Sequence, residues 1–85
     1  METKPEGITV YGTTWCSDCV RAKRYLDAHH VAYRWVNIEE DAVARARVEE
    51  INRGMRSVPT IVFPDGSVLV EPSDQQLAAR LQACS

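Results

Sequence analysis

The order of strand-like and helix-like segments most restricts the fold of this chain. Residues 8–11 are β-branched and aromatic between two glycines, residues 19–26 place apolar side chains at helical spacing, and residues 33–38 return to a β-rich pattern. A strand, a helix and a strand in this order predict a parallel pair joined by a right-handed crossover. Because the crossover helix must cover the sheet, we expect an α/β domain.

A second helix is expected after residues 33–38. Three acidic residues at 39–41 suit the positive end of a helix dipole, and Gly54 is the expected stop. The expected apolar stripe consists of Ala44, Val48, Ile51 and Met55.

The last third of the chain predicts a hairpin and a final helix. The run 58–63 is the expected third strand, and turn residues at 64–67 lead to a fourth strand at 68–70, antiparallel to the third. Ser73 and Gln76 form a capping-box pattern. The apolar stripe of the helix that follows is Leu77, Leu81 and Cys84. The complete prediction is βαβαββα, with a four-stranded mixed sheet flanked by helices.

Composition limits what such a domain does. The 85 residues are 45% hydrophobic, enough for one core, so residues 1–85 are expected to form a single domain. Ten basic and twelve acidic residues nearly cancel, which argues against nucleic acid as a partner. No apolar run suits a membrane span or a signal peptide, so we expect a cytoplasmic protein without a membrane partner.

Cys16 and Cys19 form a C-x-x-C between the first strand and the first helix. At a helix N-terminus, unpaired backbone N–H groups and the helix dipole favour a thiolate at Cys16. Cys19 lies one turn further on, within reach of the first sulfur. The spacing therefore predicts a nucleophile that forms a mixed disulfide and a second thiol that resolves it.

Two other interpretations of the cysteine pair stay open. Zinc needs four ligands, and beyond the pair the chain offers only Cys84, His29 and His30, so no metal site is expected. Two buried core cysteines would explain Cys19 on its apolar stripe but not Cys16 in the preceding loop. Cys84 is expected to be structural or frayed at the terminus and is given no redox role.

Two residues near the pair also allow alternatives. Trp15 directly precedes the reactive cysteine, which favours an exposed rim position over a core position, whereas Trp35 is expected in the core. Pro59 opens the third strand, and the local sequence alone favours a trans bond after Val58.

Several motifs together resemble the glutaredoxin branch of the thioredoxin superfamily over nearly the whole chain. They are W-C-x-x-C at the strand-to-helix junction, V-P-T at the third strand, the Asp-Gly hairpin and the Ser-Asp helix start. Residues 13–16 and 71–74 are most similar to the mycoredoxins, actinobacterial glutaredoxin-like proteins that act with mycothiol. The resemblance implies the thioredoxin/glutaredoxin fold and a thiol–disulfide oxidoreductase.

The resemblance also implies roles for single residues. Cys16 would be the attacking cysteine and Cys19 the resolving one. Pro59 would be cis and lie beside Cys16, and the backbone of Val58 would pair in β fashion with the cysteinyl part of a low-molecular-weight thiol.

The resemblance places the far end of the small thiol at the start of the last helix. Ser73 and Asp74 stand where glutaredoxins hold the γ-glutamyl end of glutathione, although Ser73 could equally be only a helix cap. Two departures disfavour an anionic tripeptide: Thr13 replaces a lysine that pairs with a carboxylate, and Glu71-Pro72 replaces paired glycines. Thr13 and Trp15 are therefore expected to contribute to specificity, and mycothiol rather than glutathione is the expected co-substrate.

The implied function is reduction of mixed disulfides between proteins and mycothiol by a monomer without a bound cofactor. A flavin-dependent thiol reductase would supply electrons indirectly, by recycling the small thiol. Two alternatives stay open: a redoxin driven by thioredoxin reductase that serves ribonucleotide reductase, and an iron–sulfur carrier or scaffold that uses Cys16 with an external thiol.

Overall fold

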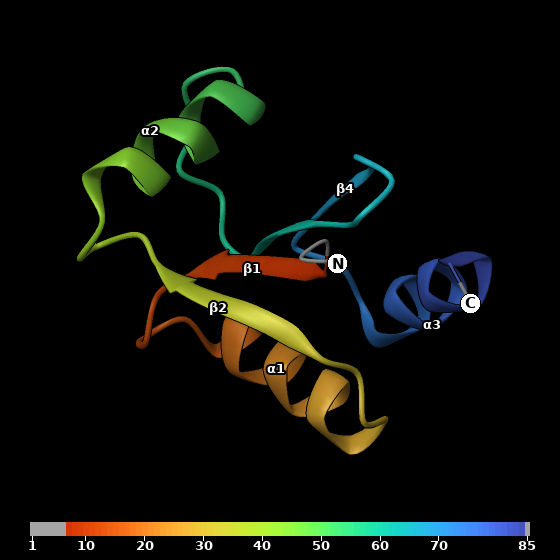
Figure 1. The fold of residues 1–85 in the computed structure, drawn as a ribbon. Helices are drawn as coiled ribbons and strands as arrows, with labels where there is room; N and C mark the ends of the chain where they lie inside the picture. Colours follow the sequence, from red (N-terminus) through yellow and green to blue (C-terminus); the bar gives the residue numbers. More distant parts are fainter. Residues whose placement is uncertain (1–6, 85) are drawn as a thin grey trace.

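A computed structural model describes residues 7–84, with side chains described for residues 7–82 (Figure 1). The elements in chain order are β1 (Ile8–Gly12), α1 (Ser17–Ala28), β2 (Tyr33–Asn37), α2 (Ala42–Ile51), β3 (Thr60–Val62), β4 (Val68–Val70) and α3 (Asp74–Cys84). The strands form one sheet in the order β2-β1-β3-β4. Strand β1 is parallel to β2, and the other neighbouring pairs are antiparallel. The predicted element order and mixed sheet are confirmed.

Strand pairing brings two distant loops together. The β1–β3 ladder places Tyr11, near the end of β1, opposite Thr60, the first residue of β3. The loop that follows β1 and the loop that precedes β3 therefore leave the sheet at the same edge. These two loops contain Cys16 and the Val58-Pro59 pair.

The sheet has a different cover on each face. On one face, α1 and α3 contribute to a buried cluster made of Ile8, Val10, Ala22, Leu26, Ile61, Phe63 and Leu77. On the other face, α2 buries Ala44 and Val48 with Ile38, and Tyr11 and Val36 pack against them. Figure 1 shows α1 and α2 on opposite sides of the sheet. Alternation along β1 explains this division, because Val10 and Tyr11 point to opposite faces.

Helix α1 follows the predicted apolar stripe. Cys19, Ala22 and Leu26 are its buried residues. The helix ends at its C-cap His29, which is followed by His30 at a φ of 57°. Trp35 differs from its predicted core position, because it is only partly buried and packs at the margin of the cluster, with the Lys23 ammonium 4.0 Å from its ring centroid.

The predicted stop at Gly54 lies close to the observed end of α2, because Gly54 has a φ of 96° and donates its N–H to the Glu49 carbonyl at 2.6 Å, but the predicted apolar stripe is wrong at Met55. The helix stops at the cap residue Asn52, whose side chain donates hydrogen bonds to the Val48 carbonyl at 3.0 Å and to Thr60 Oγ1 at 3.1 Å. Arg53 then adopts a φ of 56°, which takes the chain out of the helical path. Met55 consequently lies outside the helix and is 64% exposed, so it is not part of the apolar stripe.

The third strand is shorter than predicted, because its ladder begins after Pro59, which has no backbone N–H to donate. The hairpin is confirmed: Gly66 has a φ of 89°, and Asp65 accepts hydrogen bonds from the N–H and hydroxyl of Ser67. Within residues 7–84, no helix is long and apolar enough to cross a membrane. The side chain of Cys84, expected on the apolar face of α3, lies outside the described residues.

Candidate active site

Cys16 is the N-cap of α1, as its position in the sequence predicts. Its sulfur accepts a hydrogen bond from the backbone N–H of Cys19 at 3.3 Å, and its S–H faces the carbonyl oxygen of Val58 at 3.8 Å. The side chain is partly exposed and the thiol is free. The sulfur thus lies at the start of α1, with a helix N-terminal N–H directed at it.

Cys19 has the opposite environment. Its side chain is 0% exposed, and its sulfur lies beside Gly12, as does the ring of Trp35. A Cβ atom at Gly12 would lie 2.6 Å from the Cys19 sulfur and 2.8 Å from a Trp35 ring carbon, so only glycine fits there without movement. Burial, followed by the hydrogen bond with Cys16, raises the pKa of Cys19 to about 12. Cys19 is therefore a protonated thiol at neutral pH.

The Val58-Pro59 peptide bond is cis, as the family resemblance implies and against what the local sequence favours. Pro59 is buried, and its carbonyl accepts a hydrogen bond from the Glu71 N–H at 2.8 Å. The carbonyl of Val58 faces Cys16. An extended peptide-like group that pairs with Val58 would thus come close to the Cys16 sulfur.

Trp15 and Thr13 lie at different depths around the cysteines. The side chain of Trp15 is 70% exposed, which confirms the rim position, and its indole N–H donates to Glu39 Oε2 at 2.8 Å. Thr13 is only 3% exposed, and its hydroxyl has no hydrogen-bond partner among the described residues. Thr13 therefore lies beneath the surface next to Gly12, and its expected contribution to specificity stays a prediction.

The start of α3 forms the predicted capping box. The Gln76 N–H donates to Ser73 Oγ at 3.1 Å, and the Ser73 N–H donates to Gln76 Oε1 at 2.8 Å. This confirms Ser73 as a cap. Asp74 is half exposed, and its carboxylate lies 3.8 Å from Nε of Arg21.

Arg21 makes a contact near the site that the sequence does not reveal. Its guanidinium donates to the carbonyl of Pro72 at 3.2 Å and pairs with Asp18 at 3.2 Å. The contact with Pro72 joins residues 51 positions apart, so no local pattern predicts it.

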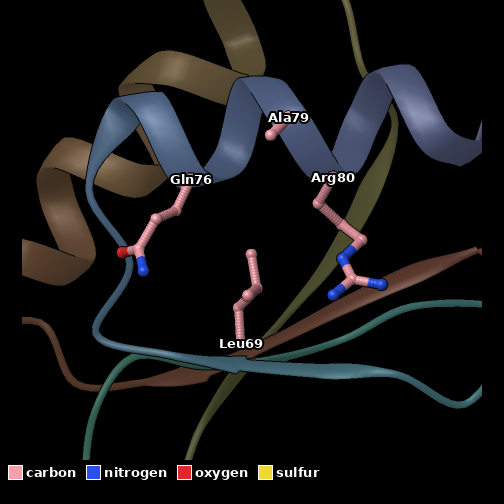
Figure 2. Close-up of a pocket in the computed structure, with 4 residues that line it drawn as sticks. All are labelled: Leu69, Gln76, Ala79 and Arg80. Carbon is pink, nitrogen blue, oxygen red and sulfur yellow. The ribbon is translucent and has the colours of Figure 1, made fainter.

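A separate groove of about 410 Å³ lies between β4 and α3. Figure 2 shows Gln76 and Arg80 of α3 flanking Leu69 of β4, and Ala79 completes the lining. Neither cysteine lines this groove, so the thiol chemistry does not take place there.

The profile of the glutaredoxin family matches residues 8–69, which include both cysteines and the cis-proline. The chain belongs to the glutaredoxin family. A Mycobacterium tuberculosis protein named as a putative glutaredoxin is 43% identical over 74 residues, which cover 87% of this chain and 88% of the relative.

Other relatives of this glutaredoxin-family chain have more specific names. Mycoredoxin 1 of Corynebacterium glutamicum is 30% identical over 76 residues, 89% of this chain and 94% of the relative. The glutaredoxin-like protein NrdH of Lactococcus lactis is 33% identical over 58 residues, 68% of this chain and 78% of the relative. The solved structure of the thioredoxin-like protein BC3987 superposes with a TM-score of 0.75 at 33% identity, covering 85% of this chain and 96% of that one. The thioredoxin-like fold is therefore shown.

Proposed function

We propose that this chain removes low-molecular-weight thiols from protein mixed disulfides, with mycothiol as its co-substrate. The observation that carries the proposal is the contrast at the first turn of α1. Cys16 is partly exposed and accepts a helix N-terminal N–H, whereas Cys19 is fully buried. The Cys16 sulfur can therefore reach a substrate, whereas the Cys19 sulfur is not accessible to one.

The first step transfers the small thiol to Cys16. The Cys16 thiolate attacks the small-thiol sulfur of the mixed disulfide, a new S–S bond forms, and the protein–small-thiol bond breaks. The electron pair leaves with the substrate cysteine, which takes up a proton. The substrate protein is thereby reduced, and Cys16 carries the small thiol.

Two routes can complete the cycle. In the first, a second small thiol loses its proton and attacks the small-thiol sulfur of the adduct, which frees Cys16 and forms a small-thiol disulfide. In the second, Cys19 loses its proton and attacks the Cys16 sulfur, which frees the small thiol and forms a Cys16–Cys19 disulfide. The burial of Cys19 favours the first route.

Binding of the small thiol would use the loop before β3 and the start of α3. The Val58 carbonyl faces Cys16 and would accept a backbone-type N–H from the cysteinyl part. The exposed Asp74 and the α3 N-terminus would contact the far end of the ligand. Trp15 would form the rim on the side of Glu39.

Three observations support mycothiol over glutathione. Thr13 is a buried neutral residue where glutathione-using members place a cation, and Glu71 adds an exposed negative charge before α3. Both features weaken binding of an anionic tripeptide. The relative named mycoredoxin 1 supports the same choice.

The test is turnover of a model peptide mixed disulfide, with mycothiol and glutathione offered in parallel. We expect mycothiol to support turnover with a higher kcat/KM. Turnover with glutathione but not with mycothiol would overturn the choice of thiol, and no turnover with either would overturn the reductase itself.

A redoxin driven by thioredoxin reductase is the second candidate, favoured by the similarity to the protein named NrdH. The two functions differ in what reduces the oxidised protein. Thioredoxin reductase with NADPH should leave an oxidised Cys16–Cys19 pair unreduced if mycothiol is the electron donor. Rapid NADPH oxidation in that assay would favour the redoxin.

A further inference from the structure

We infer that Arg21 is a positioning residue that holds the start of α3 against the cysteine helix and occupies the Asp74 carboxylate. The site thereby disfavours small thiols with a free ammonium group at their far end. The inference rests on the proposed function, because it takes Cys16 as the acceptor of the small thiol. It adds a determinant of ligand charge that lies outside the C-x-x-C, the cis-proline and the helix cap.

One guanidinium group makes three contacts. Nη2 of Arg21 donates to the Pro72 carbonyl at 3.2 Å, Nη1 lies 3.2 Å from Asp18, and Nε lies 3.8 Å from Asp74. Asp18 belongs to the same helix as Arg21, whereas Pro72 and Asp74 flank the helix cap Ser73. Arg21 therefore connects the helix of the two cysteines to both sides of the α3 start.

The same segment is also bonded to the loop before β3. The N–H of Glu71 donates to the Pro59 carbonyl at 2.8 Å, and Pro72 is buried. The cysteine helix, the cis-proline loop and the α3 start are thus tied to one another through residues 71 and 72. A planar guanidinium serves several partners at fixed angles, which a lysine ammonium does not do.

The contacts of Arg21 affect the charge at the start of α3 more than they affect the free energy of unfolding. Arg21 and Asp74 have side chains that are 48% and 55% exposed, and ion pairs at such sites contribute little to stability. At the proposed ligand site, however, Arg21 already pairs with the Asp74 carboxylate, which is the group that would bind an incoming ammonium group. That ammonium would also meet the positive guanidinium at short range. A neutral, acylated nitrogen meets neither obstacle.

The test compares two peptide mixed disulfides that differ only at this nitrogen: one carries glutathione, with a free ammonium group, and the other carries N-acetylglutathione, with a neutral acylated nitrogen. Single-turnover release of the peptide by the full chain gives the maximal rate and the half-saturation concentration for each. We expect Arg21→Gln to shift the preference toward the glutathione substrate by about two- to fivefold, the range of an exposed ion pair. The shift should appear in half-saturation and not in the maximal rate.

Two further variants show whether the effect passes through Asp74. In the Asp74→Asn background, Arg21→Gln should shift the preference by clearly less than in the wild-type background, because no carboxylate is left to release and only the repulsion by the guanidinium is removed. Asp74→Asn alone should change the preference less than twofold, since Arg21 already occupies that group. This single variant keeps the inference testable if Arg21→Gln does not fold.

Arg24→Gln is the matched control, because Arg24 is exposed on the same helix and its loss changes net charge equally. An unchanged preference in Arg21→Gln, or an equal shift in Arg24→Gln or in the double variant, would overturn the inference. Loss of peptide release with both substrates in the wild-type chain would instead refute the proposed function.

Discussion

Cys16 and Cys19 lie one helical turn apart and have opposite surroundings. Cys16 caps the helix, is partly exposed and receives a backbone N–H, whereas Cys19 is fully buried against Gly12 and Trp35. The C-x-x-C spacing alone does not show how accessible each thiol is, whereas the fold leaves the Cys16 side chain partly exposed and buries that of Cys19. The difference arises from β1, because the end of this strand at Gly12 leaves room for the Cys19 sulfur.

The largest effect is expected from Cys16→Ser. A serine hydroxyl is not ionised at neutral pH, so turnover of a mixed disulfide should fall by at least about a thousandfold. The measurement is steady-state reduction of a peptide mixed disulfide. Cys19→Ser is the matched control and should retain most of the activity with a small thiol present. Complete loss in Cys19→Ser would show that the second cysteine is obligatory.

The pH dependence of the Cys19 step is the next largest effect. The raised pKa keeps Cys19 protonated, so its thiolate fraction, about one in 10⁵ at pH 7, grows tenfold with each pH unit below that pKa. Burial is the first cause of the shift, and it acts separately from the hydrogen bond and charge of Cys16. Release of the small thiol from a preformed Cys16 adduct, without added thiol, should therefore still rise steeply between pH 8 and 10. If the release rate instead reached a plateau near the ordinary pKa of a cysteine, the raised pKa of Cys19 would be contradicted.

Gly12→Ala tests the enclosure of Cys19 directly. The new methyl group would overlap the Cys19 sulfur and the Trp35 ring, and overpacking of this kind costs about 1–3 kcal/mol. This exceeds the gain of about 0.4–1 kcal/mol that alanine gives through the unfolded chain. Denaturant unfolding should show a net loss, part of which Cys19→Ala recovers in the same background. Unchanged stability would mean that the pocket around Cys19 is loose.

The smallest effect is expected at the rim beside Cys16. Glu39→Ala removes the acceptor of the Trp15 indole N–H, an exposed hydrogen bond that contributes about 1 kcal/mol or less. We expect greater acrylamide quenching of Trp15 fluorescence in a Trp35→Phe background, and a KM for the mixed disulfide raised about twofold with kcat retained. The neighbouring Glu40→Ala is the control. Equal quenching in both variants would show that Glu39 does not hold the ring.

Local pattern was sufficient to predict the element order and the position of Cys16. Both depend on features that act within a few residues: alternation, helical spacing, turn residues and a cap. The apolar stripe of α2 was predicted to continue to Met55, but the helix stops at the cap residue Asn52, whose side chain donates to Thr60. That bond forms only once the strand and the helix are packed together.

Contacts between distant segments account for the rest of the site. The joining of Arg21 to Pro72, and of Trp15 to Glu39, depends on how the helices and loops meet around the sheet. The cis bond before Pro59 is similar, because the local sequence favours trans and only the family resemblance implies cis. Sequence patterns therefore point to the two cysteines, whereas the groups around a bound ligand can be identified only from the tertiary structure.

The most direct test of the central claim is to locate the first adduct. The reduced wild-type chain is mixed with an equimolar peptide mixed disulfide, quenched with acid within milliseconds, and mapped by mass spectrometry of its peptides. The account predicts that the small thiol is found on Cys16, with Cys19 unmodified. A first adduct on Cys19, or equal amounts on both cysteines, would contradict the division of roles that the first turn of α1 implies.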